Sequence, residues 1–373
     1  MRRYLNVTFT NLLFNLIWWI TSKFSLKFSK RLMSFGIRDG AFPIKNVYDP
    51  ILKVNALGFT FKNPIGVAAG IDKKGTLIDG LIQIGFGFGE FGSYTLEKEM
   101  PMSKAYYLMR DKAILMQPLG YRNPGIASMI PIFTARRHLP HIIGINIATS
   151  TPFESENVKQ GTLMTYEKEF TMMAQKVAPY CDYIVLNFSH PDTELSTIIS
   201  DKSTILPILK EVKAAVKIAA PIQTPKVLVK LPLDITPMEV SLVCTTLMDG
   251  QADGVIVAGM QSLSKHSKKL LQDKKYHHMG TLSGKPIRDI STELIRRIYQ
   301  NTMGKLPIIA CGGVFTGQDA FEKITSGATL VQIHTSLIFE GPNVVNRINK
   351  ELAEILREKG YKSVMDAIGA DFN

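Results

Sequence analysis

LPIIACGGVFTGQDAFEKITSGATLVQIHT, residues 306–335, is the stretch of this chain that decides its fold. It opens on a buried-strand pattern that ends at the pair Gly312-Gly313. A helix then follows from Thr316, and a second apolar strand ends at His334-Thr335. A strand, a helix and a second strand in this order predict a βαβ unit with parallel strands.

The two strand ends of this unit also predict an anion site. Glycines after a strand let backbone N–H groups approach an anion, and the helix that follows adds its favourable dipole. In a (β/α)8 barrel the loops after the seventh and eighth strands commonly hold a phosphate. Thr316 and Asp319 are placed to cap the helix start. An ordinary strand–helix turn with glycines for tightness is the alternative.

Strand and helix patterns alternate from residue 60 to the end of the chain. Near-continuous apolar strands indicate burial on both faces and hence a parallel sheet. Eight strand–helix repeats predict an α/β fold with a closed (β/α)8 TIM barrel over residues 45–373. The expected strands are Ile65–Ala69, Phe86–Tyr94, Ile142–Ile147, Tyr183–Phe188, Val227–Leu231, Gly254–Val257, Ile308–Ala310 and Leu330–Ile333. The expected helices include Thr165–Val177, Thr204–Lys217, Pro237–Leu247, Thr292–Asn301 and Val344–Lys359.

Composition narrows the class of protein. The 373 residues are 45% apolar and 20% charged, which is typical of a globular core. Cys181, Cys244 and Cys311 lie far apart in apolar segments, which favours a reducing compartment and argues against disulfides or a metal site. The net charge of +12 indicates attraction to anions. Since no basic run interleaved with aromatics stands out in the body of the chain, we expect no nucleic-acid partner.

The first 40 residues differ from the rest. Both tryptophans, Trp18 and Trp19, lie in an apolar run that asparagines interrupt and that lysines and arginine follow. The run is too short to span a bilayer comfortably and lacks a signal-peptide cleavage pattern. Aromatics beside cations predict a helical segment at the membrane interface. A helical hairpin packed on the barrel is the alternative.

Polar residues gather at the predicted carboxyl ends of the strands, where barrels carry their chemistry. Lys73 and Lys230 stand out, because an ammonium in or beside an apolar strand is costly unless it meets an anion. An internal salt bridge accounts for either lysine alone. Together with Asn146 and Asn187, which end two other strands, they favour a polar, electron-rich ligand at the mouth.

Several motifs, in this order, resemble the dihydroorotate dehydrogenase family, and the resemblance covers about residues 45–373. The N-terminal segment is similar to that of the quinone-dependent, membrane-associated class. The resemblance implies an FMN that takes a hydride from dihydroorotate, giving orotate, and a membrane quinone that reoxidises it. The motifs are NPIGVAAGIDKKG (Asn63–Gly75), GFGFGEFGSYT (Gly85–Thr95), VLVKLPLDIT (Val227–Thr236), LSGKPIRDIS (Leu282–Ser291), Gly312–Asp319 and DAIGAD (Asp366–Asp371).

The same resemblance assigns a flavin site. It implies that backbone lies against the ring, that amides and a hydroxyl bind the ring or its chain, and that one lysine lies near its N1–O2 edge. It also implies that glycine amides and a threonine bind the phosphate, next to a histidine that stands where the family has tyrosine. The backbone against the ring is that of Ala68, Ala69 and Gly70, and the groups that bind the ring or its chain are Ser93, Asn146 and Asn187. The lysine near the N1–O2 edge is Lys230. The phosphate residues are Gly284, Gly313 and Thr335, and the histidine beside them is His334.

The pyrimidine side departs from the family pattern. Lys73 and Asn187 are kept, Gln117 and Tyr121 stand in the altered segment after Met116, and His190 replaces the serine that removes the C5 proton. Asp192 stands where an amide is expected, and Ala258-Gly259-Met260 replaces Thr-Asn-Thr. Each hydrogen bond lost to a buried ligand costs about 1–3 kcal/mol. His190 is suited to act as the base, with Lys73 as the second catalytic residue. A loop histidine without a proton-transfer role is the alternative.

Three hypotheses follow. The first is a quinone-dependent dihydroorotate dehydrogenase with a histidine base, bound peripherally at the cytoplasmic face of the cell membrane or at the inner mitochondrial membrane. The second is a diverged FMN-binding paralogue with another substrate or no dehydrogenase activity. The third is a non-enzymatic membrane-surface protein, which the intact flavin motifs disfavour. Fold alone does not choose among them.

Overall fold

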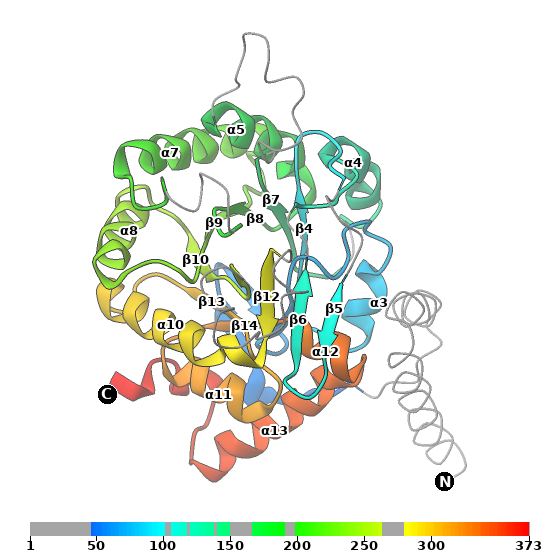
Figure 1. Ribbon diagram of the computed structural model, residues 1–373, viewed down its shortest axis with the longest axis vertical. Helices are drawn as coiled ribbons and strands as arrows, with labels where there is room; N and C mark the ends of the chain where they lie inside the picture. Colours follow the sequence, from blue (N-terminus) through cyan, green and yellow to red (C-terminus); the bar gives the residue numbers. More distant parts are fainter. Residues whose placement is uncertain are drawn as a thin grey trace.

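Eight parallel strands close into a barrel, as predicted (Figure 1). The computed structural model describes residues 46–100, 106–117, 120–137, 140–149, 166–190, 198–262 and 280–372. In chain order the barrel strands are β3 (Ile65–Val67), β4 (Phe88–Tyr94), β7 (Ile143–Ile147), β8 (Tyr183–Asn187), β9 (Lys226–Leu231), β10 (Gly254–Val257), β13 (Ile308–Cys311) and β14 (Leu330–Ile333). Each strand pairs with the next, and β14 returns to β3. All eight overlap the predicted strands, so the barrel prediction is confirmed.

Helices surround the barrel in Figure 1. They are α3 (Ile78–Gln83), α4 (Ile126–Thr134), α5 (Tyr166–Val177), α7 (Lys202–Ala219), α8 (Pro237–Asp249), α10 (Arg288–Thr302), α11 (Gly317–Thr325), α12 (Thr335–Glu340) and α13 (Val344–Glu358). Short 3-10 turns are η1 (Pro50–Leu52), η3 (Ala178–Tyr180), η5 (Lys285–Ile287), η6 (Val364–Ala367) and η7 (Ala370–Phe372). The largest difference from the prediction is at α10, which begins at Arg288 and not at Thr292, because its first turn is polar and hides the apolar periodicity.

Six short strands outside the barrel were not predicted. β1 (Val54–Ala56) and β2 (Phe59–Phe61) form a hairpin. β5 (Tyr107–Met109), β6 (Ile114–Gln117), β11 (Gln261–Ser262) and β12 (Thr281–Gly284) form an antiparallel sheet in the order β11-β12-β6-β5. Strands of two to four residues give little alternation to detect, and the central pair β6–β12 joins segments more than 160 residues apart.

The capping prediction for α11 is confirmed. The Thr316 hydroxyl accepts a hydrogen bond from the Asp319 backbone N–H, and the Asp319 carboxylate accepts one from the Thr316 N–H at 2.9 Å. This reciprocal pair forms a capping box, which satisfies two N–H groups that a helix start leaves open. Arg288 forms an ion pair with the same Asp319 carboxylate at 3.1 Å, which ties α10 to the start of α11.

The N-terminal prediction falls outside the described residues, which begin at Asn46. Within the part of the chain that the structure describes, no helix is long and apolar enough to cross a membrane. The division of the chain at residues 1–40 and 45–373 therefore stays a prediction.

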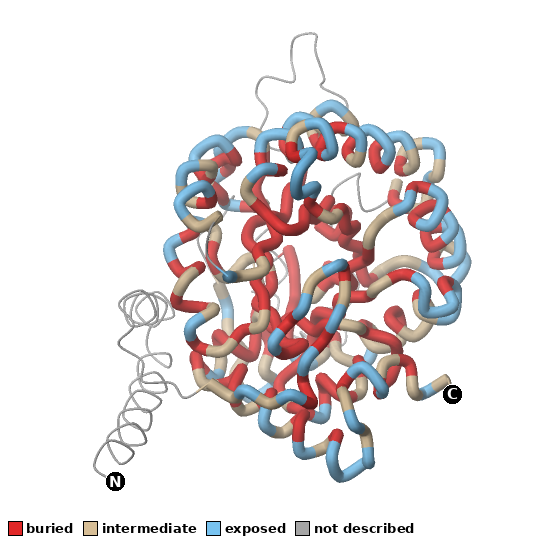
Figure 2. The backbone as a smooth tube through the Cα atoms, turned by 180° about the vertical axis from the view of Figure 1, so that it is seen from behind, coloured by how far each residue is buried: buried red, intermediate tan, exposed pale blue. Residues whose placement is uncertain are grey.

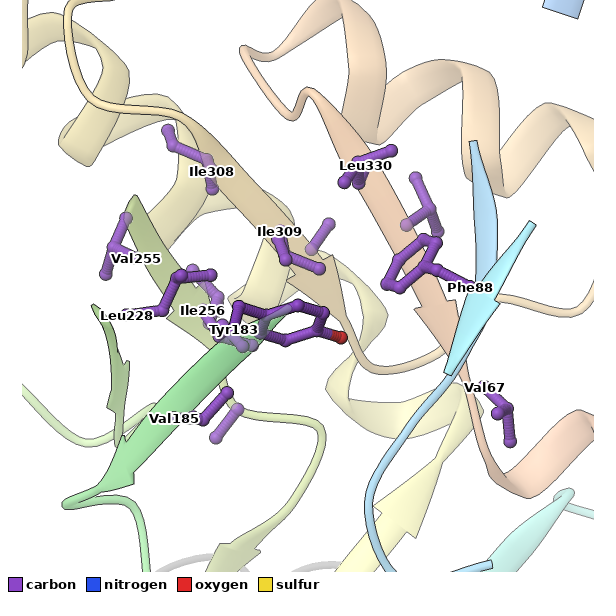
Figure 3. Packing of buried hydrophobic residues seen from close by; sticks show 14 of the residues in the cluster. Val67, Phe88, Tyr183, Val185, Leu228, Val255, Ile256, Ile308, Ile309 and Leu330 are labelled. Atoms are coloured by element: carbon purple, nitrogen blue, oxygen red, sulfur yellow. The ribbon is translucent and has the colours of Figure 1, made fainter. Parts of the chain in front are cut away.

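The barrel interior is filled by large side chains that face glycines on neighbouring strands. Burial is concentrated in the barrel strands, and the outer helix faces are exposed (Figure 2). Tyr183 and Phe88 are fully buried and point into the interior (Figure 3). A Cβ added at Gly144 would lie 2.0 Å from the Tyr183 Cζ atom, and one at Gly66 would lie 2.3 Å from the Phe88 ring. These glycines therefore make room for the two rings.

We predict that Gly144→Ala lowers the free energy of unfolding by about 1–3 kcal/mol, because the added methyl group overpacks the interior against Tyr183. Urea denaturation measures the change. Gly254→Ala is the matched control in another barrel strand, where the added Cβ meets nothing nearer than 3.1 Å. Equal effects of the two substitutions would contradict this account of the packing.

Candidate active site

A pocket lies at the carboxyl ends of the barrel strands, beside the antiparallel sheet. Its empty volume is about 720 Å³, part of it open to solvent. Eleven predicted site residues line it, from β4, β6, β8, β9 and the segments that follow β3, β6, β8 and β14: Ala68, Ala69, Gly70, Lys73, Ser93, Gln117, Tyr121, Asn187, His190, Lys230 and His334. The fold therefore brings most of the predicted site into one place.

Lys230 forms an internal salt bridge, the alternative that the sequence left open. Its Nζ atom lies 2.9 Å from Oε1 of Glu90, whose side chain is fully buried. Burial acts to lower the pKa of Lys230, but the Glu90 carboxylate outweighs it and keeps that pKa above the ordinary value. Lys230 also lines the pocket, so one buried ammonium faces both an internal carboxylate and the cavity.

Asn146 is drawn into the same buried cluster and does not line the pocket. Its Nδ2 donates to Glu90 Oε1 at 2.7 Å, and Gln332 Nε2 donates to Glu90 Oε2 at 2.6 Å. The amide oxygens of Asn146 and Gln332 are buried without a hydrogen-bond partner. Sequence reasoning missed Glu90 and Gln332, although a carboxylate and an amide inside apolar strands were the available signal.

Asn187, at the end of β8, organises a second polar group. Its Nδ2 donates to Ser93 Oγ at 2.9 Å. Its Oδ1 accepts from both the backbone N–H and the hydroxyl of Ser189, at 3.0 and 2.7 Å. These bonds fix the amide orientation and leave Asn187 and Ser93 together at the pocket wall.

Lys73 and His190 both contact Tyr121. The Lys73 Nζ donates to the Tyr121 backbone carbonyl at 2.6 Å. The Tyr121 and His190 rings lie 4.6 Å apart at 56°, and the His190 side chain is almost fully buried. The predicted base and the predicted substrate lysine therefore share one wall, and Gln117 at the end of β6 completes it.

The part of the pocket lining at the end of β10 has no hydrogen-bonding side chain. It consists of Ala258, Gly259 and Met260. A Cβ added at Gly259 would lie 2.5 Å from the Cys311 Sγ atom, so the thiol fills the space that a side chain at 259 would need. Burial raises the pKa of Cys311, which keeps the thiol neutral.

The backbone after β3 forms a third part of the pocket. Gly70 has φ +103°, and a Cβ added to it would lie 3.1 Å from His334 Nε2. Its N–H donates to the Gly92 carbonyl at 2.8 Å, and the Ala68 N–H donates to the Ile333 carbonyl. Glycine is therefore required both by the backbone conformation and by the histidine beside it.

The predicted phosphate residues lie outside this pocket lining. Thr335, the first residue of α12, shares a hydrogen bond of 2.9 Å with Ser283. Close packing accounts for two of the glycines: a Cβ at Gly284 would meet the Ala113 carbonyl oxygen at 2.0 Å, and one at Gly313 would meet Arg288 Cα at 2.5 Å. Asp192 falls outside the described residues. The phosphate assignments stay predictions.

The fold and the position of the pocket define a (β/α)8-barrel enzyme with its site at the carboxyl ends of the strands. The family model of dihydroorotate dehydrogenase matches residues 51–356. The chain therefore belongs to the dihydroorotate dehydrogenase family.

Relatives place the chain in the quinone class of that family. The mitochondrial dihydroorotate dehydrogenase (quinone) of Mus musculus is 35% identical over 332 residues, covering 86% of this chain and 80% of the relative. That of Rhodospirillum rubrum is 33% identical over 87% of this chain and 84% of its own length. The crystal structure of ligand-free DHODH from Eimeria tenella has a TM-score of 0.83 at 27% identity and covers 94% of this chain and all of that one.

Lys323 of α11 is a second buried lysine. It is fully buried, and the hydrogen-bond partners of its Nζ among the described residues are neutral oxygens: those of Arg288 (backbone carbonyl, 3.3 Å), Ser291 (3.0 Å) and Thr292 (3.1 Å). Burial lowers the pKa of Lys323 to about 7. Between about pH 7 and its ordinary value of 10.5, the unfolded chain therefore holds a proton that the folded protein lacks.

We predict that the free energy of unfolding rises with pH above 7, with Lys323 contributing up to about 1.4 kcal/mol per pH unit. The stability of Lys323→Met should lack this contribution. Urea denaturation from pH 6 to pH 9 measures both slopes. Lys350→Met, at an exposed lysine of α13, is the control and should keep the parental slope. An unchanged slope in Lys323→Met would refute the assignment.

Proposed function

We propose that this chain oxidises dihydroorotate to orotate in pyrimidine biosynthesis, with FMN as its cofactor and a membrane quinone as electron acceptor. Its family and its quinone-class relatives support this proposal. The observation that carries it is the convergence of Lys73, His190 and Lys230 on one pocket at the barrel mouth. Those residues supply an ammonium for a substrate carboxylate, a base and a second, charge-compensated ammonium.

The residues of the pocket fit a flavin. Ala68, Ala69 and Gly70 present backbone without bulky side chains, and Lys230 supplies a buried ammonium at one edge. Asn187 and Ser93 add polar groups that a mutual hydrogen bond holds in place. Bound FMN would supply the hydride acceptor that no side chain can provide.

The protein groups would orient the substrate and move its proton. Lys73, fixed by the Tyr121 carbonyl, is positioned to pair with the dihydroorotate carboxylate. His190 would accept the C5 proton at an imidazole nitrogen, since a neutral imidazole carries a nitrogen lone pair that can take up a proton. The Tyr121 ring packs against His190 and shields it from water.

A diverged flavoprotein with another substrate is the second candidate, and one observation favours it. The wall formed by Ala258, Gly259 and Met260 offers no side-chain hydrogen bond to a pyrimidine. Leaving polar groups of a buried ligand unpaired costs about 1–3 kcal/mol each. Such a wall suits a substrate with an apolar edge.

We predict that purified protein is yellow, because oxidised flavin absorbs visible light. Under anaerobic conditions dihydroorotate should bleach this flavin absorption band. His190→Ala should slow the bleaching at least 100-fold, because general-base catalysis contributes about 10²–10⁴. Stopped-flow absorbance measures the rate.

His141→Ala is the matched control, because this histidine lies before β7 at the opposite end of the barrel. It should bleach at the parental rate. Flavin that stays oxidised in the parent protein would refute the dihydroorotate assignment and favour the second candidate. Equal rates in the parent and in His190→Ala would remove His190 from the mechanism.

We further propose that residues 1–40 hold the enzyme peripherally at a membrane, at the cytoplasmic face of the cell membrane or at the inner mitochondrial membrane, where quinone is available. The tryptophan pair and the cations of this segment support the proposal.

Deletion of residues 1–35 should therefore move the protein from the membrane fraction to the supernatant and suppress quinone reduction. Dihydroorotate should still bleach the flavin of the truncated protein, since the pocket residues remain. Ultracentrifugation and quinone absorbance measure the two effects. A truncated protein that still pellets with membranes would contradict this role.

A further inference from the structure

Glu90 of β4 lies at the centre of a buried polar cluster inside the barrel. Its side chain is fully buried, and three strands supply its partners. Lys230 of β9 and Asn146 of β7 donate to Oε1 at 2.9 and 2.7 Å, and Gln332 of β14 donates to Oε2 at 2.6 Å. A carboxylate held from three directions has little freedom to move.

The cluster combines one cation with one anion. Among the described residues, the carboxylate that pairs with Lys230 within salt-bridge distance is that of Glu90. Cys311, which also lies near Lys230, is a thiol whose pKa burial raises, so it adds no charge. Asn146 and Gln332 are neutral. The pair is therefore close to electrically neutral as a whole.

The two members of the pair face different surroundings. Lys230 lines the pocket, whereas Glu90 is absent from its lining and lies behind the lysine. A ligand in the pocket therefore meets the ammonium directly and the carboxylate at longer range. In a buried site of low dielectric, both charges act strongly on that ligand.

We propose that Glu90 is a positioning residue that holds the Lys230 ammonium at the pocket wall and offsets its charge. The net charge of the pair, not the lysine alone, then determines the reduction potential of the bound flavin. This inference rests on the proposed binding of FMN and goes beyond it. It assigns a function to a residue that lies behind the pocket lining.

Because Glu90 and Lys230 carry opposite charges, substituting one or the other should shift the flavin reduction potential in opposite directions. A flavin gains negative charge when it takes up electrons, so a neighbouring cation favours reduction and an anion opposes it. Glu90→Gln leaves a net cation and should raise the potential. Lys230→Gln leaves a net anion and should lower it. The double substitution restores a neutral pair and should return the potential close to the parental value.

The experiment is an anaerobic titration of the FMN-loaded full-length protein with dithionite and a reference dye. At a fixed dye potential, Glu90→Gln should raise the ratio of reduced to oxidised flavin at least tenfold, or about 30 mV for a two-electron couple. Lys230→Gln should lower the ratio at least tenfold. The double variant should stay within about threefold of the parent, a return that a merely structural role would not produce.

Asp182→Asn is the matched control, because Asp182 is another buried carboxylate, paired with Arg137 at 3.5 Å outside the pocket. It should leave the ratio unchanged. An unchanged or lowered ratio in Glu90→Gln overturns the proposal, as does a double variant that keeps the shift of Lys230→Gln. The second comparison decides the question if Glu90→Gln alone does not fold.

The titration does not use dihydroorotate. A parent protein that binds FMN and shows these shifts but ignores dihydroorotate contradicts the proposed substrate and supports the role of Glu90. If dihydroorotate bleaches the flavin but the substitutions leave its reduction potential unchanged, the proposed substrate is supported and the role of Glu90 is contradicted.

Discussion

The buried ion pair between Glu90 and Lys230 is the constraint on which the rest of the site depends. Leaving one charge of such a pair without its partner costs about 3–5 kcal/mol, so the two strands that carry it must keep their register. Asn146 and Gln332 extend the pair to two further strands. Below this polar layer, rings such as those of Tyr183 and Phe88 fill the barrel against glycines. The pair thus separates an apolar core from the pocket and sets one unit of charge at the pocket wall.

The antiparallel sheet gives the barrel mouth its second side. β6 contributes Gln117, and β12 contributes Thr281 and Ser283 to the pocket lining. The pairing of β6 with β12 brings these residues over the strand ends although they are distant in sequence. Ser283 also bonds Thr335 at the start of α12, so the sheet is tied to the corner between β14 and α12. The site is consequently built from two layers that the chain joins only by long-range pairing.

Much of the barrel could be predicted from the sequence, because most of its strands are near-continuous apolar runs and α11 carries a recognisable capping box. The pocket could be predicted in large part, since parallel strands place their carboxyl ends at one edge. The small sheet could not, because its strands are too short to show a period and their pairing is non-local. The partner of Lys230 could not be named, because Glu90 lies 140 residues away in sequence and only the barrel brings the two side chains together. The roles of Gly284 and Gly313 also depend on neighbours, Ala113 and Arg288, that no local pattern reveals.

The two walls of the pocket differ in a way that one substitution cannot reverse. Lys73, Gln117 and His190 make one wall polar, whereas Ala258, Gly259 and Met260 make the other apolar. A side chain at position 259 would collide with Cys311, so an amide there requires a smaller residue at 311 as well. Gly259 and Cys311 are therefore a coupled, well-packed pair. The pocket lining takes hydrogen-bonding side chains from Lys73, Asn187 and Lys230 among others, but none from residues 258–260. The Gly259–Cys311 contact therefore gives the pocket its shape at this point and adds no side-chain hydrogen bond from position 259.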